Sequence, residues 1–220
     1  MKHTFFIKDW LNSFLSLLFP HCCVVCGRPL AKGEECLCIM CNINLPRTNY
    51  HLWKDNPVER LFWGQIPLER ATSFFFYRKG SDFRQILHQL KYGGKKEVGI
   101  IMGRYMAAEL SDSGFFEGVD VIIPIPLHKK KQQIRGYNQS ECIARGIAAV
   151  TGITVCVESV VRRKNTETQT RKSVFERWEN VDGIFELNHA DSLTGKHILI
   201  VDDVLTTGAT TIACASRLAE

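Results

Sequence analysis

The sequence predicts an α/β fold in which helices flank a parallel sheet, with a small metal-binding module ahead of it. Three patterns support this expectation. The apolar run Ile198–Val201 leads directly into two acids, a Thr/Gly loop and a helical stretch, as at the carboxyl edge of a parallel sheet. Strand-like runs and helical stretches alternate before it. Two C-x2-C pairs near the start have the spacing of metal ligands.

Composition sets the limits of the interpretation. The chain has 220 residues, 45% of them hydrophobic and 23% charged, which suits one ordinary globular domain plus a small module. A net charge of +5 is compatible with phosphate ligands or nucleic acid and is diagnostic of neither. Six of the nine cysteines lie between Cys22 and Cys41. Crowded spacing of this kind favours a metal site in a reducing, cytoplasmic compartment over disulfides.

Residues 1–20 are predicted to form an amphipathic helix. Apolar residues recur there at helical spacing: Ile7, Leu11, Phe14, Leu15 and Leu18. Lys8, Asp9 and Asn12 interrupt the apolar centre that a secretory signal needs, and the stretch is short for a bilayer span. We expect this helix to pack on the neighbouring module or on a second copy of the chain in a homodimer. Contact with a membrane surface is the less favoured alternative.

Residues 21–45 are predicted to form a structural zinc module. The expected ligands are the two C-x2-C pairs, Cys23, Cys26, Cys38 and Cys41, which can place four thiolates tetrahedrally around Zn²⁺. Cys22 and Cys36 remain alternative ligands, and reduced cysteines without metal remain an alternative explanation. Four thiolates leave no open coordination position, so the site is expected to stabilise the fold of the module.

A connector, residues 46–70, is expected to pack its aromatic residues Trp53, Phe62 and Trp63 on the larger domain, residues 71–220. That domain is predicted to begin with a strand at residues 71–77. A helix follows, capped by Ser81 or Asp82 and running to Lys91. The next helix spans residues 98–110, and the residues expected to face inward on it are Ile101, Met102, Tyr105 and Met106.

A strand at residues 119–123 is predicted to run into a proline-braced loop. The loop comprises Pro124, Ile125, Pro126, Leu127 and His128, followed by Lys129–Lys131 and Arg135. Basic side chains beyond the carboxyl end of a strand are well placed to meet a polyphosphate. A solvated basic loop is the alternative. A helix is expected from the end of this segment to Val150.

Two interpretations remain open for the polar stretch after the next predicted strand, residues 155–161. Residues 162–180 lack apolar periodicity, which suits either a mobile lid over a reactive substrate or a solvated surface helix. Residues 181–187 are predicted as a short strand and residues 191–196 as a turn.

The stretch after Ile198–Val201 carries the candidate chemistry. Asp202 and Asp203 leave the strand at its carboxyl end, where carboxylates can accept hydrogen bonds from sugar hydroxyls or bind a metal. The loop that follows contains Thr206, Thr207, Gly208, Ala209 and Thr210. Its backbone amides and hydroxyls precede a helix, whose N-terminus attracts phosphate. An ordinary strand-to-helix turn is the alternative, and a Walker loop fits poorly because its Gly-Lys-Ser/Thr ending is absent.

This stretch resembles the signature of type I phosphoribosyltransferases, which bind phosphoribosyl pyrophosphate (PRPP). From about Pro20 onward, the ordered set of motifs is similar to that of the ComF family, phosphoribosyltransferase-like proteins associated with DNA uptake in competent bacteria. The motifs are the two C-x2-C pairs, LKYGG, DVIIPIPLH, RGYNQS, RRKNTETQT, RWENVDGIF and LIVDDVLTTGAT.

The resemblance implies a role for each motif. Asp202 and Asp203 would face the ribose hydroxyls and Mg²⁺, and residues 206–210 would hold the 5′-phosphate. Residues 124–128 match the family's pyrophosphate loop, and Lys91 and Arg135 are candidate phosphate contacts. The family's fold ordinarily adds a strand after the last helix, where this sequence ends at Glu220, so we expect either that the sequence is cut short or that the sheet lacks an edge strand.

Two functions are therefore expected, and a third is weaker. The first is a phosphoribosyltransferase with an unidentified nitrogenous acceptor, acting in DNA uptake. The second is a non-catalytic protein that senses PRPP or binds single-stranded DNA, with Lys129–Lys131 and residues 162–164 along the backbone and Tyr137 or Trp178 stacking on bases. The third is docking of the zinc module and first helix on a membrane or a partner of the uptake machinery.

Overall fold

The computed structural model describes residues 21–163 and 183–220, and these divide into two compact units. The first unit comprises residues 21–46 and 77–86, and the second comprises residues 47–76, 87–163 and 183–220. Within the described ranges, none of the helices combines the length and apolar character needed to cross a membrane. The predicted helix at residues 1–20 and most of the polar stretch at residues 162–180 lie outside the described residues.

The second unit has the predicted α/β architecture. Its parallel sheet has the order β2 (Thr154–Val155), β1 (Val121–Pro124) and β5 (Ile198–Val201). Val121 of β1 is in register with Ile198 of β5, and Pro124 with Val201. Both strands therefore end at the same edge of the sheet, which is the edge where ligands bind in open α/β folds.

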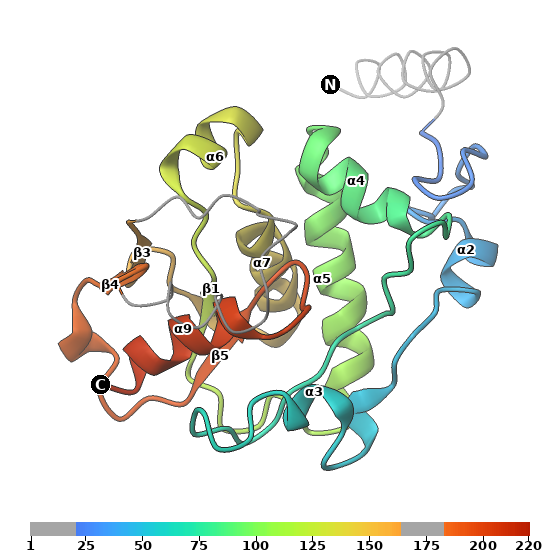
Figure 1. Ribbon diagram of the computed structural model, residues 1–220. Coiled ribbons are helices and arrows are strands. Elements are labelled where there is room, and N and C mark those ends of the chain that lie inside the picture. Colours follow the sequence, from blue (N-terminus) through green and yellow to red (C-terminus); the bar gives the residue numbers. More distant parts are fainter. Residues whose placement is uncertain (1–20, 164–182) are drawn as a thin grey trace, which may run out of the picture. The chain divides into compact units, whose positions relative to one another are not determined.

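Alternate residues of the central strands pack against opposite layers, as the twofold side-chain period of a strand requires. Val121 and Ile123 join a buried cluster with Ala213 of α9 (Ala209–Leu218). Ile122 faces the other way and packs with Ala107 of α5 (Lys96–Ser111) and Ala144 of α7 (Gln139–Thr151). Figure 1 shows α9 on one side of β1 and β5, with α5 and α7 on the other.

Helices α5 and α7 approach closely because small residues line their contact. A side-chain carbon added to Gly103 of α5 would meet the carbonyl oxygen of Ile143, and one added to Gly146 of α7 would meet that of Ile100.

The prediction of which α5 residues face inward was wrong in part. Met102 is buried, but the other buried residues of α5 are Val98, Gly99, Gly103, Ala107 and Leu110. The predicted residues Ile101, Tyr105 and Met106 are only half-buried.

The strand predicted at residues 155–161 is divided between two sheets. Val155 belongs to β2, whereas β3 (Val160–Arg162) pairs antiparallel with β4 (Phe185–Leu187). The chain leaves the parallel sheet after the Cys156 amide donates to the carbonyl of Ile122, and it bends before β3 begins. The short helix η2 (Ala190–Ser192) then precedes β5.

The segment before α4 (Arg84–Tyr92) contains η1 (Tyr50–Leu52) and α3 (Pro57–Arg60). Its predicted strand at residues 71–77 is wrong, because the segment makes only an isolated bridge between Phe75 and Arg47. Pairing stops there because the opposite segment turns away at Asn49, whose φ of 55° is left-handed. Phe62 is buried with Ile212 of α9, as expected for the connector's aromatic residues, but Trp53 and Trp63 are exposed.

In the first unit, a turn around residues 23–28 and the short helix α2 (Ile39–Ile43) surround the cysteines. The carboxylate of Glu34 accepts hydrogen bonds from the amides of Ala31 and Ile39, both at 2.7 Å. Glu34 thereby connects the loop to the first residue of α2 and satisfies an amide that the helix itself leaves unpaired.

Candidate functional site

The four cysteines of the two C-x2-C pairs form one cluster in the first unit. The Sγ atoms of Cys23, Cys26, Cys38 and Cys41 all lie within 4.8 Å of one another. Those of Cys26 and Cys38 are 3.7 Å apart. A zinc–sulfur bond of about 2.3 Å implies roughly this separation between two ligands of a tetrahedral site. The cluster can therefore bind a structural zinc ion, and the alternative ligands Cys22 and Cys36 lie outside it.

The cluster is also electrostatically suited to a cation. Hydrogen bonds from Arg28 lower the pKa of the Cys26 thiol to about 6, which favours the thiolate that binds metals. Burial raises the pKa of Cys41 above its ordinary value, because a thiolate buried without a cation is costly. Three of the four cysteines are buried, as expected for a closed structural site.

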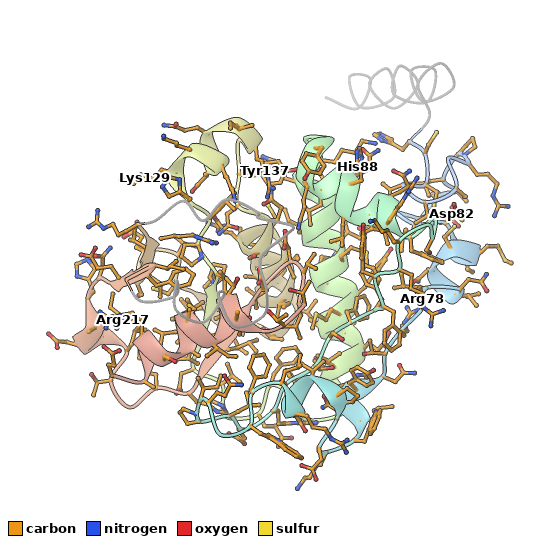
Figure 2. All side chains as sticks on the ribbon, in the orientation of Figure 1. Arg78, Asp82, His88, Lys129, Tyr137 and Arg217 are labelled. Carbon is orange, nitrogen blue, oxygen red and sulfur yellow. The ribbon has the colours of Figure 1, made fainter. Side chains whose placement is uncertain are left out.

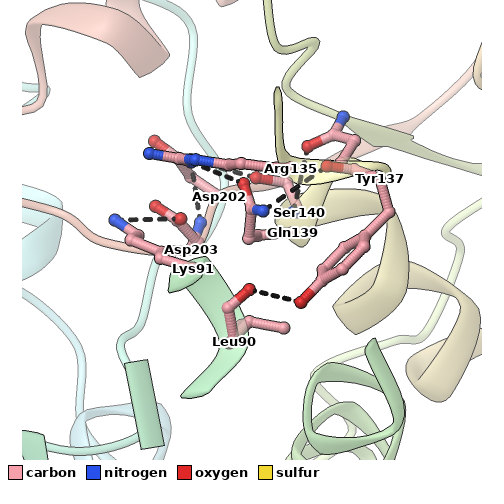
Figure 3. A network of polar contacts seen from close by, with 9 residues as sticks. Leu90, Lys91, Arg135, Tyr137, Gln139, Ser140, Asp202 and Asp203 are labelled. Atoms are coloured by element: carbon pink, nitrogen blue, oxygen red, sulfur yellow. Dashed lines mark hydrogen bonds and ion pairs between the residues drawn. The ribbon is translucent and has the colours of Figure 1, made fainter. Parts of the chain in front are cut away.

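The two predicted catalytic acids lie immediately after β5, at the edge of the sheet where β1 also ends. The Oδ1 atom of Asp202 accepts hydrogen bonds from the Asp203 amide at 2.8 Å and from the Ser140 hydroxyl at 3.1 Å. The Oδ2 atom of Asp203 lies 3.0 Å from the Nζ atom of Lys91, at the C-terminal end of α4. The predicted phosphate-binding lysine and the predicted acids therefore meet directly (Figure 3).

Burial raises the pKa of Asp202 to about 6, and the adjacent negative charge of Asp203 acts in the same direction. The hydrogen bonds from the Asp203 amide and Ser140 and the charge of Lys91 oppose the increase. Asp202 is therefore a carboxylate whose charge is poorly compensated in the protein alone. A carboxylate of this kind is suited to bind a cation or a hydroxyl donor.

The predicted phosphate loop leads into α9, which begins at Ala209. Gly208 precedes it with a φ of 77°, and a side-chain carbon there would lie 3.0 Å from the Phe62 ring, so glycine is required for both conformation and space. Among the described residues no side chain caps α9, and its first turn carries no acid. The amides at its N-terminus are thus available to an anion.

The predicted pyrophosphate loop begins inside the sheet. Pro124 is the last residue of β1, and the amide of the buried Ile125 donates to Val201 at 2.9 Å, which continues the pairing with β5. His128 caps the next helix, since its Nδ1 atom accepts from the Lys130 amide at 3.3 Å. No hydrogen bond or ion pair among the described residues joins His128 to either aspartate.

The interpretation of residues 129–135 as a loop is wrong, because they form the helix α6 (Lys129–Arg135). The histidine cap starts this helix, and Gly136, with a φ of 80°, ends it. Lys129 and Lys130 are exposed, and Figure 2 shows Lys129 on the outside of α6. Arg135 donates to Gln139 at 2.7 Å, and its guanidinium lies 5.7 Å from the centre of the Tyr92 ring.

Sequence reasoning did not assign roles to Ser140, Asn138 and Gln139, although it singled out the segment that contains them. All three are buried at the start of α7, and Figure 3 shows Gln139 and Ser140 close to Asp202. The available signal was an asparagine directly before a helical stretch, which is typical of a helix cap. Nothing local indicated that these side chains would reach Asp202 and the loop after β1.

Comparison with known proteins finds relatives that are similar along most of the chain. The DNA utilization protein YhgH of Shigella flexneri is 29% identical over 217 residues, which cover 92% of each chain. Competence protein ComFC of Bacillus subtilis is 26% identical over 213 residues, covering 95% of this chain and 76% of that protein. Competence protein F of Haemophilus influenzae is 34% identical over 92 residues, covering 41% of this chain and 40% of its own length. The chain is therefore similar to proteins of the ComF family.

No family model matches the sequence, and no solved structure matches it. The likeness to the ComF family therefore depends on the relatives together with the four-cysteine cluster that precedes the α/β unit in the sequence. Two ComF motifs noted in the sequence, RRKNTETQT and RWENVDGIF, fall largely or partly within residues 164–182, outside the described residues.

Proposed function

We propose that this ComF-like protein binds PRPP together with Mg²⁺ at the carboxyl ends of β1 and β5. The observation that supports this most directly is the arrangement of Lys91, Asp203 and Asp202 at the strand ends. The uncapped start of α9 follows shortly after Asp203 in the chain. A cation, two carboxylates and helix-terminal amides are the groups that a phosphorylated sugar with a pyrophosphate requires.

Each group has a proposed role. The loop residues 206–210 and the first amides of α9 bind the 5′-phosphate. Asp202 and Asp203 accept hydrogen bonds from the ribose hydroxyls. Lys91 and Arg135 face the pyrophosphate, with residues 124–128 beneath it, and Lys91 exchanges its present partner Asp203 for the more highly charged ligand.

The acids also fit Mg²⁺, which prefers oxygen ligands and is commonly bound by one or two carboxylates plus substrate phosphates. Among the described residues, no hydrogen-bond donor reaches the Oδ2 atom of Asp202, and the carboxylate of Asp203 is paired only with Lys91. When bound, Mg²⁺ neutralises charge on the leaving pyrophosphate.

The proposed chemistry is transfer of a phosphoribosyl group to a nitrogen nucleophile. Departure of pyrophosphate from C1 of the ribose leaves an oxocarbenium-like centre. Asp202 and Asp203 stabilise its positive charge, and this stabilisation is strong because Asp202 lies in a poorly solvated position. Lys91 and Arg135 stabilise the negative charge on the leaving group.

The names of the relatives refer to DNA utilization and competence. The Shigella relative is called a DNA utilization protein, and the Bacillus and Haemophilus relatives are called competence proteins. We propose that the present chain acts in the same process, in the cytoplasm, with PRPP as its small-molecule ligand.

Titration calorimetry of the zinc-loaded chain with PRPP and Mg²⁺ tests the proposal. We expect a single site with micromolar affinity, typical of metabolite binding. Affinity should fall at least about tenfold in the Asp202→Asn/Asp203→Asn variant, because each acid loses its charge. Asp112→Asn, an exposed change at the end of α5, is the matched control and should bind normally. A folded wild-type chain that binds no PRPP contradicts the proposal.

A second candidate function is binding of single-stranded DNA, and one surface feature favours it. Tyr92 is 70% exposed, and the centre of its ring lies 5.7 Å from the Arg135 guanidinium and 5.4 Å from the centre of the His88 ring. Exposed aromatic rings next to an arginine are platforms on which unpaired bases stack. Lys129 and Lys130 add exposed positive charge on α6.

This surface differs from the one expected from sequence. Tyr137 is half-buried and its hydroxyl donates to the Leu90 carbonyl, and Trp178 lies outside the described residues. Arg162 is partly buried over the Phe185 ring, where burial lowers its pKa. Arg163 pairs with Glu186.

Fluorescence polarisation with a labelled oligonucleotide at two salt concentrations tests the DNA hypothesis. Affinity should weaken strongly between about 50 and 200 mM salt, roughly tenfold or more. Tyr92→Ala should weaken it further by about tenfold, since one stacking contact contributes about 1–3 kcal/mol. Tyr77→Ala, at another exposed tyrosine, is the control. Equal affinities for the wild type and Tyr92→Ala would remove Tyr92 from the hypothesis.

A further inference from the structure

The segment Arg135–Ser140, which joins α6 to α7, buries three consecutive polar residues. Asn138, Gln139 and Ser140 are 7%, 1% and 3% exposed. Polar side chains are costly to bury unless their hydrogen bonds are satisfied. A helix start needs only one of them, the Asn138 cap that accepts from the Ser140 amide. The other hydrogen bonds of the segment therefore need a different explanation.

Two of these hydrogen bonds reach other parts of the candidate site. The Tyr137 hydroxyl donates to the Leu90 carbonyl at 2.7 Å, directly before Lys91. The side-chain amide of Asn138 donates to the Ile125 carbonyl at 3.0 Å, within the loop that follows β1. Figure 3 shows Tyr137 reaching Leu90 from the segment before α7.

A third hydrogen bond reaches the acids. Ser140 donates its hydroxyl to the Oδ1 atom of Asp202 at 3.1 Å, and the Asp203 amide donates to the same oxygen at 2.8 Å. Two donors on one oxygen fix the rotation of the carboxylate. Within the described ranges Oδ2 receives none, so it is the oxygen left for a ligand.

Arg135 and Gln139 stiffen the segment itself. Gln139 accepts a hydrogen bond from Arg135 at 2.7 Å and donates one to the carbonyl of Tyr137 at 3.4 Å. A rigid segment can hold the groups that it hydrogen-bonds, near Lys91, in the loop after β1 and at Asp202, in one arrangement. A mobile segment could not do so.

We propose that Tyr137, Asn138 and Ser140 are positioning residues, which hold Lys91, the loop after β1 and Asp202 in their ligand-binding arrangement before the ligand arrives. The proposal rests on the proposed PRPP site. Its physical basis is preorganisation: groups that are already oriented lose less conformational entropy on binding, which increases affinity without any new contact to the ligand. Ser140 is the best position for a test, because its hydroxyl would act on the ligand only through Asp202.

A double-mutant cycle tests this role. PRPP and Mg²⁺ are titrated into the wild type, Ser140→Ala, Asp202→Ala and the double variant. Ser140→Ala should weaken binding about tenfold, as expected for a lost hydrogen bond to a charged group. In the Asp202→Ala background it should have less than about a twofold effect, because the Ser140 hydroxyl then has no side-chain oxygen to orient and coupled residues are not additive. Ser159→Ala is the control, since Ser159 is also buried but its hydroxyl contacts Cys156, away from the acids.

The outcomes separate the two proposals. Absence of binding by the folded wild type overturns the PRPP site and this inference together. Normal binding by Ser140→Ala overturns only the inference. Equal weakening by Ser140→Ala in both backgrounds, or equal weakening by Ser159→Ala, also overturns it, because the hydroxyl would then act through general stability. Tyr137→Phe and Lys91→Ala provide an independent cycle with the same expected non-additivity.

Discussion

Replacing Asp202 with asparagine should stabilise the protein at neutral pH while weakening its ligand site. The folded protein raises the pKa of this carboxyl from an ordinary 3.8 to about 6, mainly through burial. The negative charge is therefore less favourable in the folded chain than in the unfolded one. The difference between the two pKa values corresponds to about 3 kcal/mol of lost stability at about pH 7.5, where both states are ionised.

The sign of the pH dependence follows from the same values. A group with a raised folded pKa contributes stability that is fully present below its unfolded pKa and is lost as the pH rises through the folded pKa. For Asp202 this window runs from about pH 4 to about pH 6. An asparagine at this position carries no charge, and its amide oxygen can still accept the Ser140 and Asp203 hydrogen bonds. The advantage of the variant should therefore shrink to about 1 kcal/mol at about pH 4.5.

Urea unfolding of the wild type and Asp202→Asn at about pH 7.5 and about pH 4.5 measures this difference. Comparing the two chains at each pH cancels the titration of other groups, and Asp112→Asn controls for loss of a surface charge. A variant less stable than the wild type at the higher pH would refute the reasoning. So would a difference that does not change with pH, because burial of a charge would then not be its cause.

Three further predictions concern stability and metal content. The chain should bind one zinc ion per molecule by elemental analysis, and Cys41→Ser should lose it whereas Cys22→Ser should keep it, because only Cys41 lies in the cluster. Gly146→Ala should lower the free energy of unfolding of the second unit by about 2–3 kcal/mol, measured by urea denaturation. The added carbon would meet the carbonyl of Ile100, so α5 and α7 would have to move apart. Asn56→Ala should cost about 3 kcal/mol in the same measurement, because this fully buried residue caps α3 and also donates to three backbone carbonyls.

Each of these has a matched control. Ala149→Ser, an exposed change in α7, should stay within about 0.5 kcal/mol of the wild type, as surface substitutions do. Asn44→Ala removes an exposed side chain with a single backbone contact and should also be mild. Zinc retained by Cys41→Ser, or Gly146→Ala and Asn56→Ala no less stable than their controls, would contradict the packing and ligand assignments above.

Local patterns were sufficient to predict the elements that form the candidate sites. Ile198–Val201 was predicted as a parallel strand and is β5, because a continuous apolar run before acids has few alternatives. The spacing of Cys23, Cys26, Cys38 and Cys41 predicted a cluster that the structure contains. Local patterns failed where a segment's partner decided its structure. Residues 71–77 are as β-prone as β5, but the segment beside them turns away at Asn49.

The sequence by itself determined which residues are candidates for metal or ligand binding. They are four thiols in two C-x2-C pairs, paired acids after a strand, and a glycine-containing loop before a helix. These features are local, so spacing along the chain is enough to recognise them. Only the tertiary structure decided how they are held. Ser140 meets Asp202 across 62 positions and Tyr137 meets Leu90 across 47, because β1 and β5 pair in one register and α7 packs beside them. Such contacts depend on how the whole sheet and its helices assemble, so no local pattern predicts them.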